Sequence, residues 1–191
     1  MNLLSLLRER TRAPHARLDA ALDFAVSGLT PDRYAAFLRG VLAVVAPLEN
    51  ALARWPVLPD GPPRAERVRS DLARLGIEER DADFLVPTPT ELAEAYGCAY
   101  VLEGSSLGGL VLARSVEENL GSDFPTSYLR LREPGTGRKW REWLERLDAW
   151  SATASKDDAD AACGMAAATF DAYTASLKRT GAITERCACT P

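Results

Sequence analysis

The chain has 191 residues, 47% of them hydrophobic and 26% charged, which predicts one domain of ordinary size with a substantial buried core. Its net charge of −4 argues against a nucleic-acid-binding protein. Residues 1–7 are too short for an export signal and no apolar run approaches the ~20 residues of a membrane span, so we expect a cytoplasmic protein without a membrane partner.

Helical spacing of apolar residues dominates and strand signals are scarce, so the sequence predicts an all-α fold. The first helical region spans residues 3–24, where Pro14 predicts a kink or the start of a second segment. The Thr-Pro pair at residues 30–31 begins the next helix, which reaches about Trp55 and is expected to kink at Pro47.

A short charged helix is predicted at residues 64–75, where Gly76 ends it. The capping-box pattern Thr88-Pro89-Thr90-Glu91 predicts the start of the longest helix, which reaches about Leu120. The remaining predicted elements are a turn near residues 127–130 and two helices at residues 138–150 and 157–179.

Ser155 with Asp158 caps the last predicted helix, and Gly181 closes it. We therefore expect one domain over residues 1–181 and a flexible tail over residues 182–191. The four cysteines fit free thiols better than a disulfide scaffold: Cys98, Cys163, Cys187 and Cys189.

His15 is the only histidine in the chain. This count excludes sites built from two or three imidazoles, including carboxylate-bridged di-iron centres, but not axial ligation of a haem iron, which needs one imidazole. Arginines surround His15 and form either a solvated helix face or a local anion site: Arg8, Arg10, Arg12 and Arg17.

The longest predicted helix contains four interior glycines, each of which costs about 1 kcal/mol relative to alanine. Gly97, Gly104 and Gly108 are seven and four residues apart and so lie along one face. Such a stripe allows either close packing of another helix or close approach of a flat ligand. Gly109 and two neighbouring serines add flexibility and polar donors. A planar ligand held between this helix and the single histidine would use all these features, and haem, whose propionates suit arginine, is such a ligand.

Two segments resemble the signatures of one family. Residues 7–19 (LRERTRAPHARLD) resemble the proximal helix of haem oxygenases, and residues 100–109 (YVLEGSSLGG) resemble their distal helix in its bacterial form. Helix order and length extend the resemblance over about residues 2–180. The resemblance implies a single-domain helical bundle with haem b sandwiched between a proximal helix and a kinked, glycine-rich distal helix. It also implies that haem is both substrate and cofactor, cleaved to biliverdin, carbon monoxide and ferrous iron with molecular oxygen and external electrons.

The resemblance also assigns roles to residues. His15 is expected to be the proximal ligand of the haem iron. Asp19 is expected to accept its other ring N–H, unless Asp19 is an ordinary solvated acid or pairs with Arg12 or Arg17. Ser105 stands where several members carry an aspartate, so hydroxyls and ordered water are expected to deliver protons. The glycines that lie over the distal face are Gly104, Gly108 and Gly109.

Propionate partners are implied at the edge of the site. Arg8 fills this role if the chain at Pro14 does not rotate it away, and Tyr100 fills it unless it packs in the core. Where both are present, the resemblance implies cleavage at the α-meso carbon and hence biliverdin IXα. A basic segment completes the propionate side, with the inward-facing member left open: Arg138, Lys139 and Arg141.

The implied electron donor is a ferredoxin or a flavoprotein reductase, and biliverdin could supply a phytochrome-type photoreceptor. Three alternatives stay open. The chain could bind haem as a carrier, store or sensor without degrading it, or it could be a helical module that binds no haem. A thiamin-degrading relative of this fold would use Cys98 as nucleophile, but apolar burial would raise its pKa.

Overall fold

The computed structural model describes residues 2–22, 28–78 and 84–183, and across these ranges the chain forms helices and no strand. The all-α prediction is confirmed. The described helices, in chain order, are α1 (Leu3–Ala21), α3 (Pro31–Leu52), α4 (Arg64–Arg74), α5 (Leu92–Leu120), α6 (Thr136–Ser151) and α7 (Lys156–Thr180).

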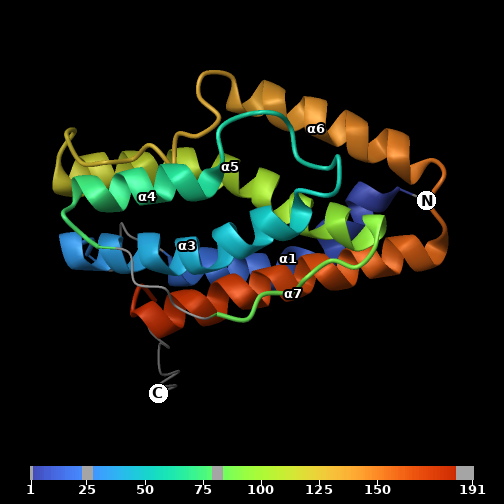
Figure 1. The fold of residues 1–191 in the computed structure, drawn as a ribbon, viewed down its shortest axis with the longest axis horizontal. Coiled ribbons are helices and arrows are strands. Elements are labelled where there is room, and N and C mark those ends of the chain that lie inside the picture. Colours follow the sequence, from blue (N-terminus) through green and yellow to red (C-terminus); the bar gives the residue numbers. More distant parts are fainter. Residues whose placement is uncertain (1, 23–27, 79–83, 184–191) are drawn as a thin grey trace, which may run out of the picture.

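Helix α7 is the common support of the bundle, since it packs against α1, α3 and α5 (Figure 1). Helix α4 packs on α3, and α6 covers α5 and the beginning of α1. Because α1 and α5 share α7 as their support, they face each other across a space that becomes the cavity described below. Large side chains from five helices fill the core, including Leu7, Leu38, Leu102, Trp143 and Leu177.

Helix α3 is long and apolar enough to cross a membrane by length and composition alone. Its apolar side chains, however, supply the core, and Tyr34, Leu38, Val44 and Leu48 are completely buried in it. This burial accounts for the apolar character of the helix.

Helices α1 and α3 run without interruption through Pro14 and Pro47. The prediction that Pro14 could start a separate segment is therefore wrong. The carbonyl that loses its helical partner belongs to Arg10, an exposed residue, where water can replace the missing N–H. Helix α3 begins as predicted, with the Thr30 hydroxyl accepting from the Arg33 N–H at 3.2 Å, but it ends at Leu52. Residues 23–24 of the predicted first helix lie outside the described ranges.

Helix α5 begins at Leu92, four residues after the predicted cap at Thr88. The Thr90 N–H and hydroxyl both donate to the Glu94 carboxylate, at 2.6 and 2.8 Å. The Pro89 carbonyl accepts from the Arg54 guanidinium and not from a helical N–H. A side chain from the turn after α3 thus keeps this segment out of α5, and the predicted capping box is corrected.

The last helix has the predicted ends. Ser155 and Asp158 form a reciprocal capping box, and Gly181 closes α7 in the left-handed conformation. Beyond it, Ala182 and Ile183 are buried, so the packed part of the chain continues past the predicted boundary at residue 181. The rest of the predicted tail, with Cys187 and Cys189, lies outside the described residues.

Gly97 permits the close approach of α5 and α7. A Cβ atom at this position would lie 2.2 Å from the Ala162 carbonyl oxygen on α7. The nearest atoms to it, in Ala162 and Ala166, all belong to the α7 backbone, so only a shift of a whole helix would relieve the contact. Close helix packing is therefore the role of Gly97.

The substitution Gly97→Ala should lower the free energy of unfolding by about 1–3 kcal/mol, because the added methyl group forces the helices apart. Gly164→Ala is the matched control, since it lies on α7 with no atom within 4 Å of the added Cβ. The control should gain up to about 1 kcal/mol from helix propensity. Urea unfolding measures both, and equal effects would contradict the close approach.

Candidate functional site

A cavity of about 460 Å³ lies between α1 and α5, within the size range of small-molecule and cofactor sites. Helices α3, α4, α6 and α7 and the loop over residues 121–135 complete its walls. Most of the wall is apolar, and many of its polar side chains come from α1 and α5. The candidate residues of the two sequence signatures meet here: Arg8, His15, Asp19, Tyr100, Gly104, Ser105, Gly108 and Gly109.

His15 stands on the α1 side of the cavity. Its Nδ1 donates to Asp19 Oδ2 at 2.8 Å, one helical turn further along. The Phe170 ring of α7 meets the imidazole edge-on, with 5.4 Å between ring centroids. Because Nδ1 is engaged, Nε2 is the nitrogen left to bind a metal, and Asp19 and Phe170 hold the ring in a defined orientation.

The glycines of α5 divide into two pairs with different roles. A Cβ atom at Gly108 would meet nothing within 4 Å, and one at Gly104 would make only ordinary contact with Trp140, at 3.6 Å. At Gly109, by contrast, it would lie 2.7 Å from the Leu129 carbonyl oxygen. Gly97 and Gly109 therefore serve packing, whereas Gly104 and Gly108 leave the α5 backbone open to the cavity. A flat ligand can approach the backbone there.

Several hydroxyl groups lie close together on the α5 side of the cavity. Ser105 Oγ donates to the Leu102 carbonyl at 2.8 Å. The Tyr128 hydroxyl lies beside those of Ser105 and Tyr173, and the buried Tyr173 hydroxyl has no hydrogen-bond partner of regular geometry among the described residues. Burial raises the pKa of both tyrosines, so both remain protonated donors. The sequence contained no local signal for Tyr128 or Tyr173, because they come from a loop and from α7.

A buried ion cluster, consisting of Glu49, Arg64, Glu103 and Arg132, adjoins these hydroxyls. Glu103 accepts hydrogen bonds from Arg64 and, at 2.7 Å, from Arg132 Nη2. Glu49 accepts from Arg64 Nη1 at 3.4 Å. Burial disfavours the charged guanidinium, but the carboxylates of Glu103 and Glu49 outweigh it and raise the pKa of Arg64.

Sequence reasoning missed this cluster, although Glu103 interrupts an apolar stretch of α5 and is only 2% exposed. A lone acid at such a position was the one available signal. Arg64 also borders the cavity, so one end of the cluster belongs to the site.

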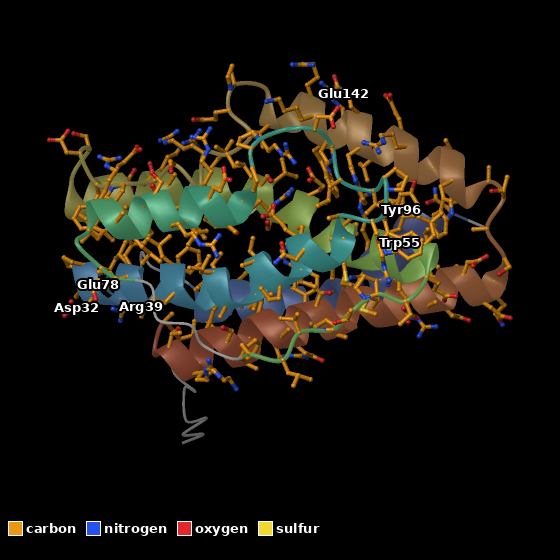
Figure 2. All side chains as sticks on the ribbon, in the orientation of Figure 1. Asp32, Arg39, Trp55, Glu78, Tyr96 and Glu142 are labelled. Carbon is orange, nitrogen blue, oxygen red and sulfur yellow. The ribbon has the colours of Figure 1, made fainter. Side chains whose placement is uncertain are left out.

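The basic side chains at the start of α6 do not take the predicted place at the cavity. Arg138 pairs with Glu142 at 2.7 Å, and Figure 2 shows Glu142 on the outer side of α6. Arg141 lines a separate surface pocket with Leu144. The residue that reaches the cavity from this segment is Trp140. The helical period turns the indole toward α5 and the predicted propionate partners Arg138 and Arg141 away from the cavity.

Cys98 is fully buried, and it does not line the cavity. Burial raises the pKa of its thiol to about 11, and the Thr169 hydroxyl donates to its sulfur at 3.5 Å. At neutral pH the residue is therefore an inert thiol. The alternative that Cys98 is a catalytic nucleophile loses its support.

The chain is similar to known proteins, although no family model matches it. Heme oxygenase PigA of Pseudomonas aeruginosa is 31% identical over 146 residues, which cover 72% of this chain and 73% of that protein. A heme oxygenase of Xanthomonas campestris pv. campestris is 33% identical over 124 residues, 60% of this chain and 73% of that protein. Among solved structures, the NO- and CO-bound heme oxygenase of Neisseria meningitidis matches over the full length of both chains, with a TM-score of 0.71 and 22% identity.

Cys98 should resist alkylation by iodoacetamide at pH 8 in the folded protein, because a buried thiol with a pKa of about 11 carries almost no thiolate there. Peptide mass spectrometry after brief exposure measures the modification. The same treatment in urea, where Cys98 becomes accessible, is the control. Rapid modification of Cys98 in the folded protein would contradict its assignment as a packing residue.

Proposed function

The chain belongs to the haem oxygenase family, and we propose that it cleaves haem oxidatively to biliverdin, carbon monoxide and ferrous iron. One observation carries the proposal. A single imidazole, held by a carboxylate, faces a stretch of α5 where Gly104 and Gly108 leave the backbone bare. This pairing suits a wide, flat ligand with a metal at its centre.

The α1 side fits an iron ligand. Asp19 fixes the His15 tautomer in which Nε2 can bind the metal. If haem binds here, His15 would hold its iron through one imidazole, as a single histidine does in other haem proteins. Haem, when bound, supplies the oxygen chemistry, while the protein supplies binding, orientation and proton donors.

The α5 side fits the opposite face. Gly104 and Gly108 would allow the α5 backbone to approach a flat ligand closely. In place of a carboxylate, the hydroxyls of Ser105, Tyr128 and Tyr173 stand at this end of the cavity. They can hold ordered water and pass protons along it. Arg64 adds a buried cation beside them.

Two residues are placed to meet the propionates. Arg8 lines the cavity from α1 and Tyr100 lines it from α5. Both side chains can donate hydrogen bonds to a carboxylate. We propose that they seat haem so that the α-meso carbon is attacked and that the product is biliverdin IXα. Arg138 and Arg141 have no part in this seating.

We propose further that the electrons come from a ferredoxin or a flavoprotein reductase in the cytoplasm. Exposed arginines on α1, the helix that carries His15, support this proposal, because they offer positive charge to an acidic donor: Arg8, Arg12 and Arg17. Delivery of biliverdin to a phytochrome-type photoreceptor rests on the family resemblance alone.

Haem titration followed by turnover tests the proposed reaction. Wild-type protein should develop a Soret band with haem and, given an electron donor and air, replace it with biliverdin absorption. His15→Ala should lose turnover, and Asp19→Asn should weaken haem binding by about 10-fold, as for other partners of metal-bound histidines.

Chromatography should identify the product as the IXα isomer. A Soret band that persists during turnover conditions would favour a carrier, store or sensor of haem. Absence of any Soret shift would favour a module that binds no haem. Mainly β or δ isomer would overturn the proposed seating alone.

Gly108→Leu should leave the fold intact but fill the space over the ligand. Because the glycine has no neighbour within 4 Å, the protein should gain up to about 1 kcal/mol of helix propensity. Haem affinity or carbon monoxide binding should nevertheless fall. Gly164→Leu, at an equally open helical position away from the cavity, should gain similar stability and bind haem normally. Normal ligand binding by Gly108→Leu would contradict the placement of this glycine.

A further inference from the structure

The segment of α5 over residues 104–109, here called the distal segment, is poorly suited to hold its own position. Its sequence is Gly-Ser-Ser-Leu-Gly-Gly, and each glycine in a helix costs about 1 kcal/mol relative to alanine. Its largest side chain, Leu107, is 40% exposed and does little to anchor the helix. Contacts at the two ends must therefore determine where this segment lies.

The 121–135 loop holds both ends. At the N-terminal end, Arg132 Nη2 donates to Glu103 Oε1 at 2.7 Å, immediately before Gly104. At the C-terminal end, the Leu129 carbonyl lies so close to Gly109 that a Cβ atom there would be 2.7 Å from its oxygen. The same loop thus meets α5 on either side of the bare backbone.

The loop is itself fixed to other helices. Asp71 of α4, which is fully buried, accepts from the Ser127 N–H at 3.0 Å, the Ser127 hydroxyl at 2.6 Å and the Tyr128 N–H at 2.9 Å. Tyr34 of α3 donates to the Pro125 carbonyl at 2.7 Å. The loop is therefore a rigid connection between α3, α4 and the distal segment.

We propose that the 121–135 loop is a brace that sets the position of the distal segment over the ligand, with Arg132 and Glu103 as its positioning residues. This proposal rests on the proposed function for its consequence, since the braced backbone is the wall that would cover haem. Neither residue lines the cavity, so both act through the backbone of α5.

Arg132 is the better of the two to alter. Glu103 is buried between two arginines, and its removal would leave both without a shared partner. Loss of Arg132 releases the loop but leaves Glu103 hydrogen-bonded to Arg64, the cation that Glu103 then shares with Glu49. Arg132→Met should therefore loosen the distal segment without unfolding the protein.

Arg130→Met is the matched control. Arg130 belongs to the same loop and also forms ion pairs, at 2.6 Å with Glu117 and 2.8 Å with Glu133. Both pairs are partly exposed, and the pair with Glu117 joins the loop to α5 beyond the distal segment. The control thus removes an arginine and its ion pairs while the attachment at Glu103 stays intact.

Amide hydrogen exchange in the haem-free protein tests the brace. In Arg132→Met the amides of residues 104–109 should exchange about 10-fold faster than in wild type, while those of residues 95–99 stay within about twofold. Arg130→Met should match wild type in both segments. Arg132→Lys keeps a positive charge beside Glu103 but loses the planar guanidinium, so its exchange rate should fall between those of wild type and Arg132→Met. Equal exchange of residues 104–109 in all four proteins would overturn the proposal.

If Arg132→Met fails to fold, the Arg132→Lys exchange decides the question in the same way. With haem bound, carbon monoxide dissociation should change by about fivefold or more in Arg132→Met and not in Arg130→Met, while haem affinity stays within about twofold. A wild type that shows no Soret band would defeat the proposed function and leave the exchange result valid. Normal haem binding with unaltered exchange would defeat the brace alone.

Discussion

The site depends on the buried ion cluster formed by Glu49, Arg64, Glu103 and Arg132. Removing charges from water costs several kcal/mol per ion, and such charges are tolerated only when each has a well-placed partner. Here two acids and two bases compensate each other and join α3, α4, α5 and the 121–135 loop. The junction lies immediately before the glycine-rich distal segment of α5. The cluster thus fixes the position of the distal segment, whose own side chains anchor it weakly.

The α1 and α5 walls of the cavity are suited to a flat ligand in opposite ways. On α1, a single imidazole is held by side chains, through a hydrogen bond to Asp19 and an edge-on contact with Phe170. On α5, side chains are missing at Gly104 and Gly108, and the backbone itself forms the surface. A ligand that fits between them must be flat, must offer a metal to His15 and must tolerate close contact on its other face. Haem meets these requirements, and membership of the haem oxygenase family indicates that the bound haem is degraded.

Local signals predicted the helices well where the determinants were local. The Ser155 cap of α7 depends on neighbours in sequence, and it formed as expected. The start of α5 was mispredicted because Arg54, distant in sequence, holds the Pro89 carbonyl. The same limit applies to the site. Its two signatures could be found by pattern, but the partners of Glu103 lie 39 and 29 residues away and left no pattern. Composition also could not show that Trp140, and not its basic neighbours, faces the cavity.

The central claim is that His15 binds the haem iron, and the sequence offers an unusually direct test of it. Because His15 is the only histidine, growth with ¹⁵N-labelled histidine labels one imidazole in the whole protein. Nuclear magnetic resonance of the haem-free protein should show one set of ring nitrogen signals. Addition of ferric haem should shift these signals far outside the normal range, or broaden them beyond detection, because the ring is bonded to a paramagnetic iron. Ring signals that stay unchanged while haem is bound would contradict the claim.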